Sequence, residues 1–459
     1  MPFIIFLFLF ILQAIAIPLQ LKSPLDDDFY TLPQGYEAAA PGDILKFRPA
    51  PAQLASLFIS IKVKNVWQLV VRSEDSFGQP TAFVTTIIEP FNADPSKVVS
   101  YQTMEDSASL NCSPSYGLQS GAPISTIATQ YDMTFMMIAL ENGYFVASPD
   151  YEGFISAFTV GRRSGQAVLD SVRAVIKSGN FTGIKKDAKV GLWGYSGGAL
   201  ASGWAALLQP SYAPELKSTL VGASLGGFVT NITAVAEIVD GELFAGLIPV
   251  ALTGVSNEYP VAKTLIAENI APQHLAKFNE AGNKCLIPSV LYFFNDHILT
   301  GKDPMFPAGF SLLQNGQVKE IVEENSIVYL DSSYVPKIPI FVYHGTLDKV
   351  VPIKDVYVTY DNWCQWGINS FEFAEDTLNG HISEQLVGGP ASWTWLNGIF
   401  QGNNPVSGCS HTKRVSNLLY PGISSATKQY FEGIKDSLLK VKLGPDAKNM
   451  TVIDIMNKY

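Results

Sequence analysis

The sequence predicts an α/β fold, in which a mainly parallel β-sheet is covered by helices and carries a helical insertion. Three observations support this prediction. Segments typical of buried strands alternate with segments of helical periodicity between residues 144 and 208. Residues 229–325 then keep an apolar helical periodicity without a strand rhythm. Strand-like segments return at 338–345 and 370–374, so the helical region is expected to be inserted between strands of one sheet.

The N-terminal segment, residues 3–17, is expected to be part of a secretory signal peptide. It is almost entirely apolar, yet shorter than the ~20 residues that a membrane-spanning helix needs. Ala14-Ile15-Ala16 matches the small-residue pattern of a cleavage site, so we predict that residues 1–16 are removed and that the protein is secreted. An uncleaved anchor is the alternative, because the usual basic residues are missing. No second long apolar run follows, so we expect no stable transmembrane association.

Residues 17–228 are expected to form the first part of the core. They begin with an extended or loosely helical arm, 17–55, which is rich in Pro, Ala and Asp. Four runs of β-branched and aromatic residues are predicted to start the sheet as antiparallel strands, at 58–63, 67–72, 82–89 and 98–102. A helix over 123–141, a strand over 144–148 and a helix containing Val168–Ile176 then follow.

The apolar periodicity of residues 229–325 predicts a helical insertion placed where a lid or cap would cover the site. Its apolar residues recur at helical spacing: Val235, Ile238, Val239, Leu243, Leu247 and Ile248. Ordinary packing helices are the alternative interpretation. Residues 326–442 are expected to complete the core, with the two returning strands and a helix at 423–440. Residues 443–459 are expected to form a C-terminal flap.

The pentapeptide Gly194-Tyr195-Ser196-Gly197-Gly198 is the most informative motif of the chain. A strand-like segment, Ala188–Trp193, precedes it, and a helix-forming segment rich in small residues, Ala199–Leu208, follows it. Strand, Gly-x-Ser-x-Gly and helix together are the context of a nucleophile elbow, a strained turn that lifts a serine hydroxyl above a sheet. A glycine-rich turn is the structural alternative. The flanking segments favour a serine hydrolase with Ser196 as its nucleophile.

A nucleophilic serine needs a base, and in an α/β-hydrolase the chain order is serine, acid, histidine. The chain has five histidines: His274, His297, His344, His381 and His411. The first two fall in the insertion, and His344 lies in a predicted strand upstream of the best acid. His381, in a loop after the strand at 370–374, is the predicted base. His411, in a predicted loop beside a cysteine, is the second candidate.

Asp348 is the predicted acid of this constellation. It lies just beyond the carboxyl end of the strongly apolar strand at 338–345, and open α/β sheets place their sites at that edge. A turn aspartate is the structural alternative. Asp376 and Asp361 are the fallback acids.

An oxyanion hole requires N–H groups aimed at the negative charge that develops on the substrate oxygen. The backbone N–H of Gly197, directly after the nucleophile, is one expected donor. The second donor is expected from the loop at 102–107, which follows a predicted strand, and Asp106 is the residue that we name there.

Four cysteines and four sequons fit a secreted product. The cysteines Cys112, Cys285, Cys364 and Cys409 are candidates for two disulfides, with three possible connectivities, and free buried thiols are the alternative. The Asn-x-Ser/Thr sequons begin at Asn111, Asn180, Asn231 and Asn449. Because Asn111 is adjacent to Cys112, a glycan and a disulfide compete there. The cysteine spacing does not resemble a zinc site, so we expect no metal.

The composition limits the possible partners. The chain has 459 residues, of which 47% are hydrophobic and 16% charged, and a net charge of −10. Because it has no block of Lys or Arg, nucleic acids and anionic membranes are excluded as expected partners. A neutral oil–water interface stays compatible with this composition. Nothing in the sequence assigns an oligomeric state.

Four stretches of the chain together resemble a known family, the secreted yeast lipases related to Candida antarctica lipase A, within the α/β-hydrolase superfamily. These stretches are Val190–Leu200, His344–Pro352, Gly380–Glu384 and Glu105-Asp106-Ser107 leading to Cys112. The resemblance implies a triacylglycerol lipase with an inserted helical lid and a mobile C-terminal flap. It also implies the pairs Cys112–Cys285 and Cys364–Cys409, places the family's oxyanion aspartate on Asp106, and implies no metal or organic cofactor.

The expected chemistry is acyl transfer through a covalent serine ester, with a lipid ester at an oil–water interface as substrate. Lipase activity is favoured over small-ester hydrolysis by the apolar insertion and the high mean hydropathy of +0.16. A broader carboxylesterase, a sterol esterase or a phospholipase on the same scaffold is the alternative. A serine peptidase is disfavoured, because nothing marks a clamp for a peptide terminus. A non-catalytic binding protein of this fold is the alternative from another class.

Overall fold

The computed structural model of the chain describes residues 21–57, 59–314 and 316–438. The predicted signal peptide (1–16), the predicted C-terminal flap (443–459) and Asn449 lie outside these residues. Among the helices of the described ranges, none is long and apolar enough to cross a membrane.

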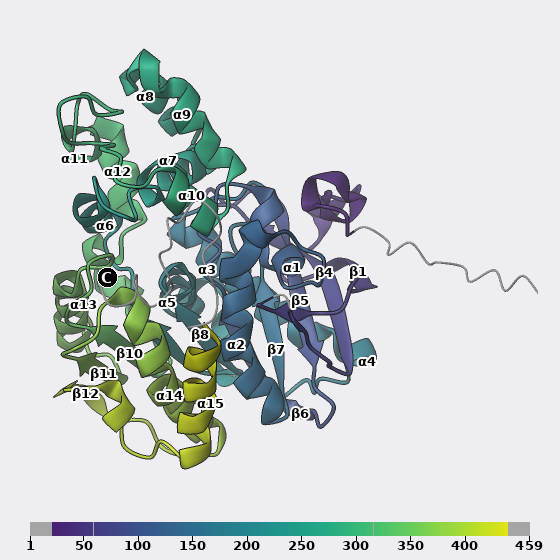
Figure 1. Cartoon of the computed structure of the whole chain (residues 1–459). Helices are drawn as coiled ribbons and strands as arrows, with labels where there is room; N and C mark the ends of the chain where they lie inside the picture. The colour runs from purple at the N-terminus through teal and green to yellow at the C-terminus, as the bar shows by residue number, and fades with distance from the viewer. Residues whose placement is uncertain (1–20, 58, 315, 439–459) are drawn as a thin grey trace, which may run out of the picture.

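A ten-stranded sheet forms the centre of the molecule, in the order β1-β4-β5-β7-β6-β8-β9-β10-β11-β12 (Figure 1). Its strands are β1 Ile44–Pro49, β4 Asn65–Glu74, β5 Pro80–Glu89, β6 Asp94–Gln102, β7 Tyr144–Pro149, β8 Lys189–Tyr195, β9 Leu220–Gly226, β10 Ile340–Gly345, β11 Ser370–Asp376 and β12 Gly408–Arg414. The pairs β1–β4, β4–β5 and β5–β7 are antiparallel. All pairs from β7 to β12 are parallel, which confirms the predicted α/β class. The short strands β2 (Ala55–Ser56) and β3 (Ile59–Ser60) pair separately.

Helices cover both faces of this sheet (Figure 1). The helices of the core are α1 Pro114–Gly117, α2 Ile127–Glu141, α3 Gly161–Lys177, α4 Gly179–Thr182, α5 Gly197–Tyr212, α13 Ile353–Gln365, α14 His381–Phe400 and α15 Ser425–Leu438. One apolar core joins α3, α5 and α13 to the sheet, and a second joins α2, α14 and α15 to its other face. Successive residues of β8 alternate between these two cores, Leu192 in the first and Trp193 in the second, because side chains alternate along a strand.

The structure differs from the sequence-based predictions in several elements. β6 is parallel to both of its neighbours, so it does not belong to the antiparallel start of the sheet. The run at 58–63 contributes only the two-residue strand β3, and the expected N-terminal arm contains β1. β9 and β12 were not predicted. β9 is rich in small residues, and β12 is a polar edge strand with little burial, so neither has the apolar run that signals a buried strand.

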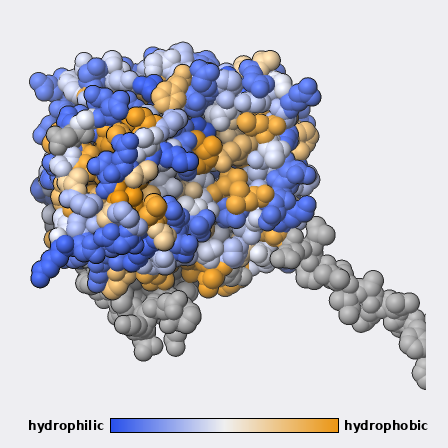
Figure 2. All heavy atoms as spheres, turned by 90° about the horizontal axis from the view of Figure 1, so that it is seen from above, coloured by the Kyte–Doolittle hydropathy of each residue, from blue (hydrophilic) through white to orange (hydrophobic). Residues whose placement is uncertain are grey.

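The insertion between β9 and β10 consists of helices joined by irregular segments, and its described residues contain no strand in 229–325. Its helices are α6 Ile232–Val239, α7 Leu247–Glu258, α8 Pro260–Asn269, α9 Leu275–Asn279, α10 Leu286–Tyr292, α11 Ser311–Gln314 and α12 Gly316–Glu324. They lie together at one end of the sheet, in the upper part of Figure 1. Figure 2 views the molecule from that side and shows apolar patches between polar side chains.

A buried ion pair fastens this insertion to the core. Arg163 of α3 contacts Glu258, the last residue of α7, at 2.7 Å, and both side chains are almost fully buried. The second oxygen of Glu258 accepts the backbone N–H of Ser76 at 2.7 Å, and Arg163 also donates to Thr81. The end of α7 is therefore held against both α3 and the turn that joins β4 to β5.

Candidate active site

Ser196 occupies a tight turn between β8 and α5. Its backbone has φ 53° and ψ −119°, a conformation that costs a non-glycine residue free energy. The flanking glycines are required by close approach rather than by their own dihedral angles. A Cβ at Gly194 would lie 2.3 Å from the backbone of Gly198, and a Cβ at Gly198 would lie 2.0 Å from the carbonyl oxygen of Gln102. This geometry is that of a nucleophile elbow.

The three residues predicted as nucleophile, base and acid are brought together in one hydrogen-bonded chain. His381 Nε2 lies 2.9 Å from Ser196 Oγ, and His381 Nδ1 lies 2.6 Å from Asp348 Oδ2. His381 is the first residue of α14, and Asp348 lies in the loop after β10. The exposed fractions are 9% for Ser196, 7% for Asp348 and 4% for His381. The serine hydroxyl, the imidazole and the carboxylate are thus in contact, and all three side chains are largely buried.

Asp348 is surrounded by N–H groups. Its Oδ1 accepts the backbone N–H groups of Val350 at 2.8 Å and Val351 at 2.7 Å. Burial alone would raise the pKa of Asp348, but the charge of His381 and hydrogen bonds from His344 and His381 hold that pKa well below its usual range. The carboxylate therefore accepts the Nδ1–H of His381, which leaves Nε2 of the neutral ring free to accept the hydroxyl proton of Ser196.

Two further residues contact His381, one at its backbone and one at its ring. Tyr195, the residue before the nucleophile, donates its hydroxyl to the carbonyl oxygen of His381 at 2.5 Å. Gly227 passes so close to the ring that a Cβ there would lie 2.9 Å from Cε1 of His381. Sequence reasoning missed both contacts, because Tyr195 occupies a variable position of the Gly-x-Ser-x-Gly motif and Gly227 belongs to no motif.

The expected oxyanion residues lie side by side. Asp106 has φ 43°, and a Cβ at Gly197 would lie 1.8 Å from Oδ1 of Asp106, so the carboxyl group rests directly on Gly197. Oδ1 has no hydrogen-bond partner among the described residues. Burial raises the pKa of Asp106 to about 7. The preceding residues of the loop are held by Asp132, which accepts the N–H of Met104 at 2.6 Å, and by Tyr151, which donates to the carbonyl oxygen of Thr103 at 2.7 Å.

An apolar cavity of about 510 Å³ begins at Ser196, Gly197 and Asp106. Its remaining lining comes from the core and from the insertion: Phe158, Thr159, Leu200, Val229, Ile232, Val235, Ala236, Val239, Leu247, Ile248, Ala251, Val350 and Val351. A second apolar cavity, of about 520 Å³, shares Thr159, Ile232, Ala236, Ile248 and Ala251 with the first. It extends toward α8 and α12, between residues such as Ala262 and Val322. Apolar space therefore leads from the serine into the interior of the insertion.

The remaining candidate residues lie away from Ser196 or have other partners. His411 is in strand β12 rather than in a loop, stacks on Phe373 and contacts Glu375 at 2.7 Å. The fallback acids serve elsewhere: Asp376 accepts three backbone N–H groups, and Asp361 is exposed on α13. In the insertion, His274 contacts Asp303 and His297 contacts Thr300.

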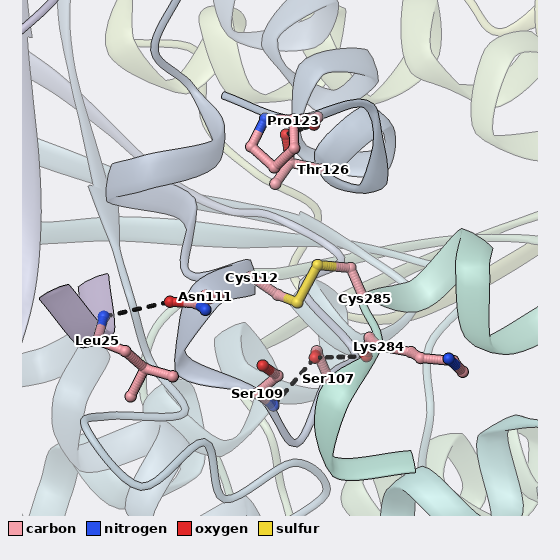
Figure 3. Close-up of a disulfide and its surroundings, with 9 residues drawn as sticks. All are labelled: Leu25, Ser107, Ser109, Asn111, Cys112, Pro123, Thr126, Lys284 and Cys285. Carbon is pink, nitrogen blue, oxygen red and sulfur yellow. Dashed lines mark hydrogen bonds between the residues drawn. A yellow bond between two sulfur atoms is a disulfide. The ribbon is translucent and has the colours of Figure 1, made fainter. Parts of the chain in front are cut away.

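Both disulfides are present, in the pairing that the family resemblance implies. Cys112 joins Cys285 and Cys364 joins Cys409. Figure 3 shows the first of these, which connects the segment after the Asp106 loop to the start of α10. Beside it, Ser107 donates its hydroxyl to the carbonyl oxygen of Lys284 at 3.0 Å. The loop that contains Asp106 and the insertion are thus joined by a covalent bond and a hydrogen bond.

The described sequons differ in accessibility. Asn180 is exposed at the start of α4. Asn231 caps α6, accepting the N–H of Ala234 and donating to Asp355. Asn111 is half-buried next to the disulfide, and its side-chain oxygen accepts the N–H of Leu25 at 3.2 Å (Figure 3). We therefore expect a glycan at Asn180 and an unmodified side chain at Asn111.

A nucleophile elbow on a mostly parallel sheet, with a histidine and an acid in sequence behind the serine, defines an α/β-hydrolase. A family model described as secretory lipase matches residues 118–408. Lipase 1 of Candida albicans is 58% identical over 95% of this chain and 93% of its own length. Lipase 6 of the same organism is 54% identical over 95% of each chain. The chain belongs to the secretory lipase family, which confirms the resemblance drawn from its motifs.

A comparison with solved structures gives the same architecture. Candida antarctica lipase A in its closed state matches with a TM-score of 0.80 and 27% identity, over 91% of this chain and 96% of that one. The rice cell wall degrading esterase LipA from Xanthomonas oryzae matches with a TM-score of 0.61 and 14% identity, which is a likeness of fold alone.

Proposed function

We propose that this chain is a secreted serine lipase that hydrolyses triacylglycerols and other long-chain esters. The observation that carries the proposal is the apolar cavity that begins at Ser196, within the hydrogen-bonded chain from Ser196 through His381 to Asp348. A serine activated in this way is a nucleophile for ester carbonyls, and a pocket lined by apolar side chains suits a long acyl chain. The names of the relatives, all lipases, support the same substrate class.

The proposed acylation step uses side chains of this chain alone. Ser196 Oγ bonds to the ester carbonyl carbon while its proton moves to Nε2 of His381, and Asp348 stabilises the imidazolium that forms. The C–O bond to the alcohol then breaks, and His381 gives its proton to the leaving oxygen. In deacylation, water transfers a proton to the same nitrogen as its oxygen bonds to the acyl carbon. The bond between that carbon and Ser196 Oγ then breaks, and His381 returns the proton to Oγ as the fatty acid leaves.

The negative oxygen of each tetrahedral intermediate is bound by Gly197 and Asp106. The backbone N–H of Gly197 is the first donor. The carboxyl group of Asp106, which rests on Gly197 and is protonated below its raised pKa of about 7, supplies the second as an O–H. This assignment makes the second donor sensitive to pH.

We propose the helical insertion, 229–325, as the lid of the site and the flanking segments 17–228 and 326–442 as the two parts of the hydrolase core. The support is the lining of the cavity, because α6 and α7 supply most of its apolar side chains. A lid with an apolar inner face excludes water from the ester and covers a surface that would otherwise be exposed. Contact with an oil–water interface is then the natural way to deliver the substrate.

The experiment is hydrolysis of p-nitrophenyl esters from C2 to C18 and of emulsified triglyceride, by the purified secreted protein and by Ser196→Ala. We expect activity that needs Ser196 and that favours long chains and emulsion. Activity confined to short soluble esters would favour the alternative of a broader carboxylesterase. A folded protein without activity on any ester would favour a non-catalytic binding protein and overturn the proposal.

Export is tested separately. The name of the family, the two disulfides and the exposed sequon at Asn180 support an extracellular product. We expect the protein in the culture medium, with a mature chain that begins after Ala16. N-terminal sequencing of the secreted protein checks the cleavage site, and a chain retained on cell membranes would contradict it.

A further inference from the structure

His344 precedes the acid in the chain, so the order of serine, acid and histidine assigns it no role. It lies near the carboxyl end of β10, four residues before Asp348, and its side chain is fully buried, with an exposed fraction of 0%. A fully buried histidine must satisfy both ring nitrogens within the protein. Each of its two nitrogens has a partner that belongs to the surroundings of the active site.

The partners of His344 determine its tautomer. The backbone N–H of Phe228 donates to Nδ1 at 3.1 Å, so Nδ1 carries no proton. The proton of the neutral ring is therefore on Nε2. This N–H donates to the carbonyl oxygen of Val351 at 3.0 Å and lies 3.2 Å from Oδ2 of Asp348. His344 is thus a neutral N–H donor directed at the acid and its loop.

The same oxygen, Oδ2 of Asp348, also accepts the Nδ1–H of His381 at 2.6 Å. The ring of His344 is therefore the second imidazole on one carboxylate oxygen. His344 also donates to the carbonyl oxygen of Val351. The backbone N–H of the same Val351 donates to Oδ1 of Asp348. His344 consequently restrains both the carboxylate and the loop that orients it.

We propose that His344 is a positioning residue that holds Oδ2 of Asp348 in line with the imidazole of His381. This inference rests on the proposed function, because it assigns His344 a part in the same site. It has two consequences. The restraint favours the geometry in which Ser196, His381 and Asp348 are in contact. The N–H of His344 also offsets part of the negative charge on Oδ2.

Other titratable groups face this part of the site. Tyr195 of β8, Tyr343 of β10 and Glu384 of α14 are fully buried around it, and burial first, then neighbouring carboxylates, raises the pKa of each of these three residues. Burial likewise raises the pKa of Asp106 on the opposite side of Ser196. These groups are unchanged in both variants described below. A difference in activity between the two variants therefore results from the substitution at His344.

The test compares two substitutions, each of which keeps the hydrogen bond of one ring nitrogen of His344 and removes that of the other. His344→Gln places an amide N–H near the position of Nε2, so it keeps the donor to Asp348 and loses the acceptor for Phe228. His344→Asn places its side-chain oxygen near Nδ1, so it keeps the acceptor and loses the donor. The measurements are kcat and KM on soluble p-nitrophenyl butyrate from pH 4 to 9, with circular dichroism and melting temperature as controls for folding.

We expect His344→Asn to lower kcat by about 10- to 100-fold with KM within about twofold, because the acid loses its alignment. His344→Gln is expected to stay within about threefold of the wild-type kcat, because it keeps the donor to Asp348. If His344→Asn does not fold, His344→Gln alone decides: a large loss of kcat in that folded variant overturns the inference.

The opposite ranking, with His344→Asn active and His344→Gln impaired, would show that His344 serves only to hold the Phe228 backbone. Equal activity in both variants would also overturn the inference. Failure of the proposed function is a different result, because the wild-type protein itself would then lack Ser196-dependent activity on the ester.

Discussion

Asp106 combines three properties at the scale of a single residue. Its backbone is in the left-handed region, its carboxyl group lies on Gly197, and burial raises its pKa to about 7. A buried carboxyl group with no hydrogen-bond partner for Oδ1 among the described residues is better placed to donate a proton than to carry a charge. The residue next to the nucleophile must be glycine, because any Cβ there would occupy the position of this carboxyl group.

The first prediction concerns the pH dependence of activity. Activity falls as the pH rises through about 7, where Asp106 loses its proton. Asp106→Asn keeps an N–H donor that does not titrate, so its alkaline limb disappears while activity near pH 6 is largely kept. Asp106→Ala removes the donor and lowers kcat by ~10²–10³-fold. The measurement is the kcat/KM profile on a soluble ester; an alkaline limb retained in Asp106→Asn would contradict this role.

At the scale of elements, the buried pair of Arg163 and Glu258 joins α7 to α3, and this contact decides how firmly the insertion is held. Glu258→Ala leaves a buried guanidinium without its partner, so we predict a loss of about 3–5 kcal/mol in the free energy of unfolding. The double variant Arg163→Met with Glu258→Leu recovers much of that loss, because neither charge is then buried.

The matched control for the buried pair is the partly exposed pair of Lys319 and Glu323 on α12, which has the same 2.7 Å separation. Glu323→Ala is expected to change stability by less than ~1 kcal/mol. Urea unfolding of all variants provides the comparison, and equal losses in Glu258→Ala and Glu323→Ala would show that the buried pair does not anchor the insertion.

A second prediction at this scale concerns α7 and chain length. Ala251 lines both apolar cavities, so Ala251→Trp is expected to fill the space between them. Hydrolysis of C12–C18 esters then falls by about tenfold or more relative to the C4 ester, because the distal acyl chain has no place to bind. Ala267→Trp, exposed on α8, is the control. An unchanged chain-length profile in Ala251→Trp would place the acyl chain elsewhere.

For the whole molecule, the notable feature is a group of buried acids beside the sheet. Burial raises the pKa of Asp132 to about 8 and of Asp150 to about 7, and burial followed by the charges of neighbouring acids raises the pKa values of Glu105 and Glu152 well above the usual range. A carboxyl group with a raised pKa binds more protons in the folded state than in the unfolded chain above about pH 4. The free energy of unfolding therefore decreases as the pH rises toward the folded pKa values.

We predict that the melting temperature falls between pH 4 and pH 8. Glu152→Gln removes one of these titrations, and a difference of one proton changes the free energy of unfolding by about 1.4 kcal/mol per pH unit. The variant is therefore expected to lose less stability over this range than the wild type. Glu242→Gln, an exposed residue, is the control. Identical slopes for Glu152→Gln and the wild type would contradict the prediction.

Much of the fold was predictable because its signals are local. The strand, the glycine-rich turn and the helix around Ser196 are contiguous, and the apolar strand before Asp348 marks the edge of the sheet. Strands β9 and β12 were not predictable in this way. β9 has small residues because its neighbours leave little room for side chains, as at Gly222, where a Cβ would lie 2.8 Å from Trp395. β12 is a polar edge strand and lacks an apolar run.

The sequence by itself determined the class of chemistry, since a nucleophile elbow and the order of serine, acid and histidine are properties of one chain read in order. Only the tertiary structure decided which groups surround these residues. Chain order disfavours His344 as the base, because it precedes the acid. In the folded protein, however, the rings of His344 and His381 both contact Asp348. The same holds for Asp106 on Gly197 and for Glu258 beside Arg163. The physical reason is that burial, pKa and hydrogen bonding depend on neighbours in space, which residue order does not specify.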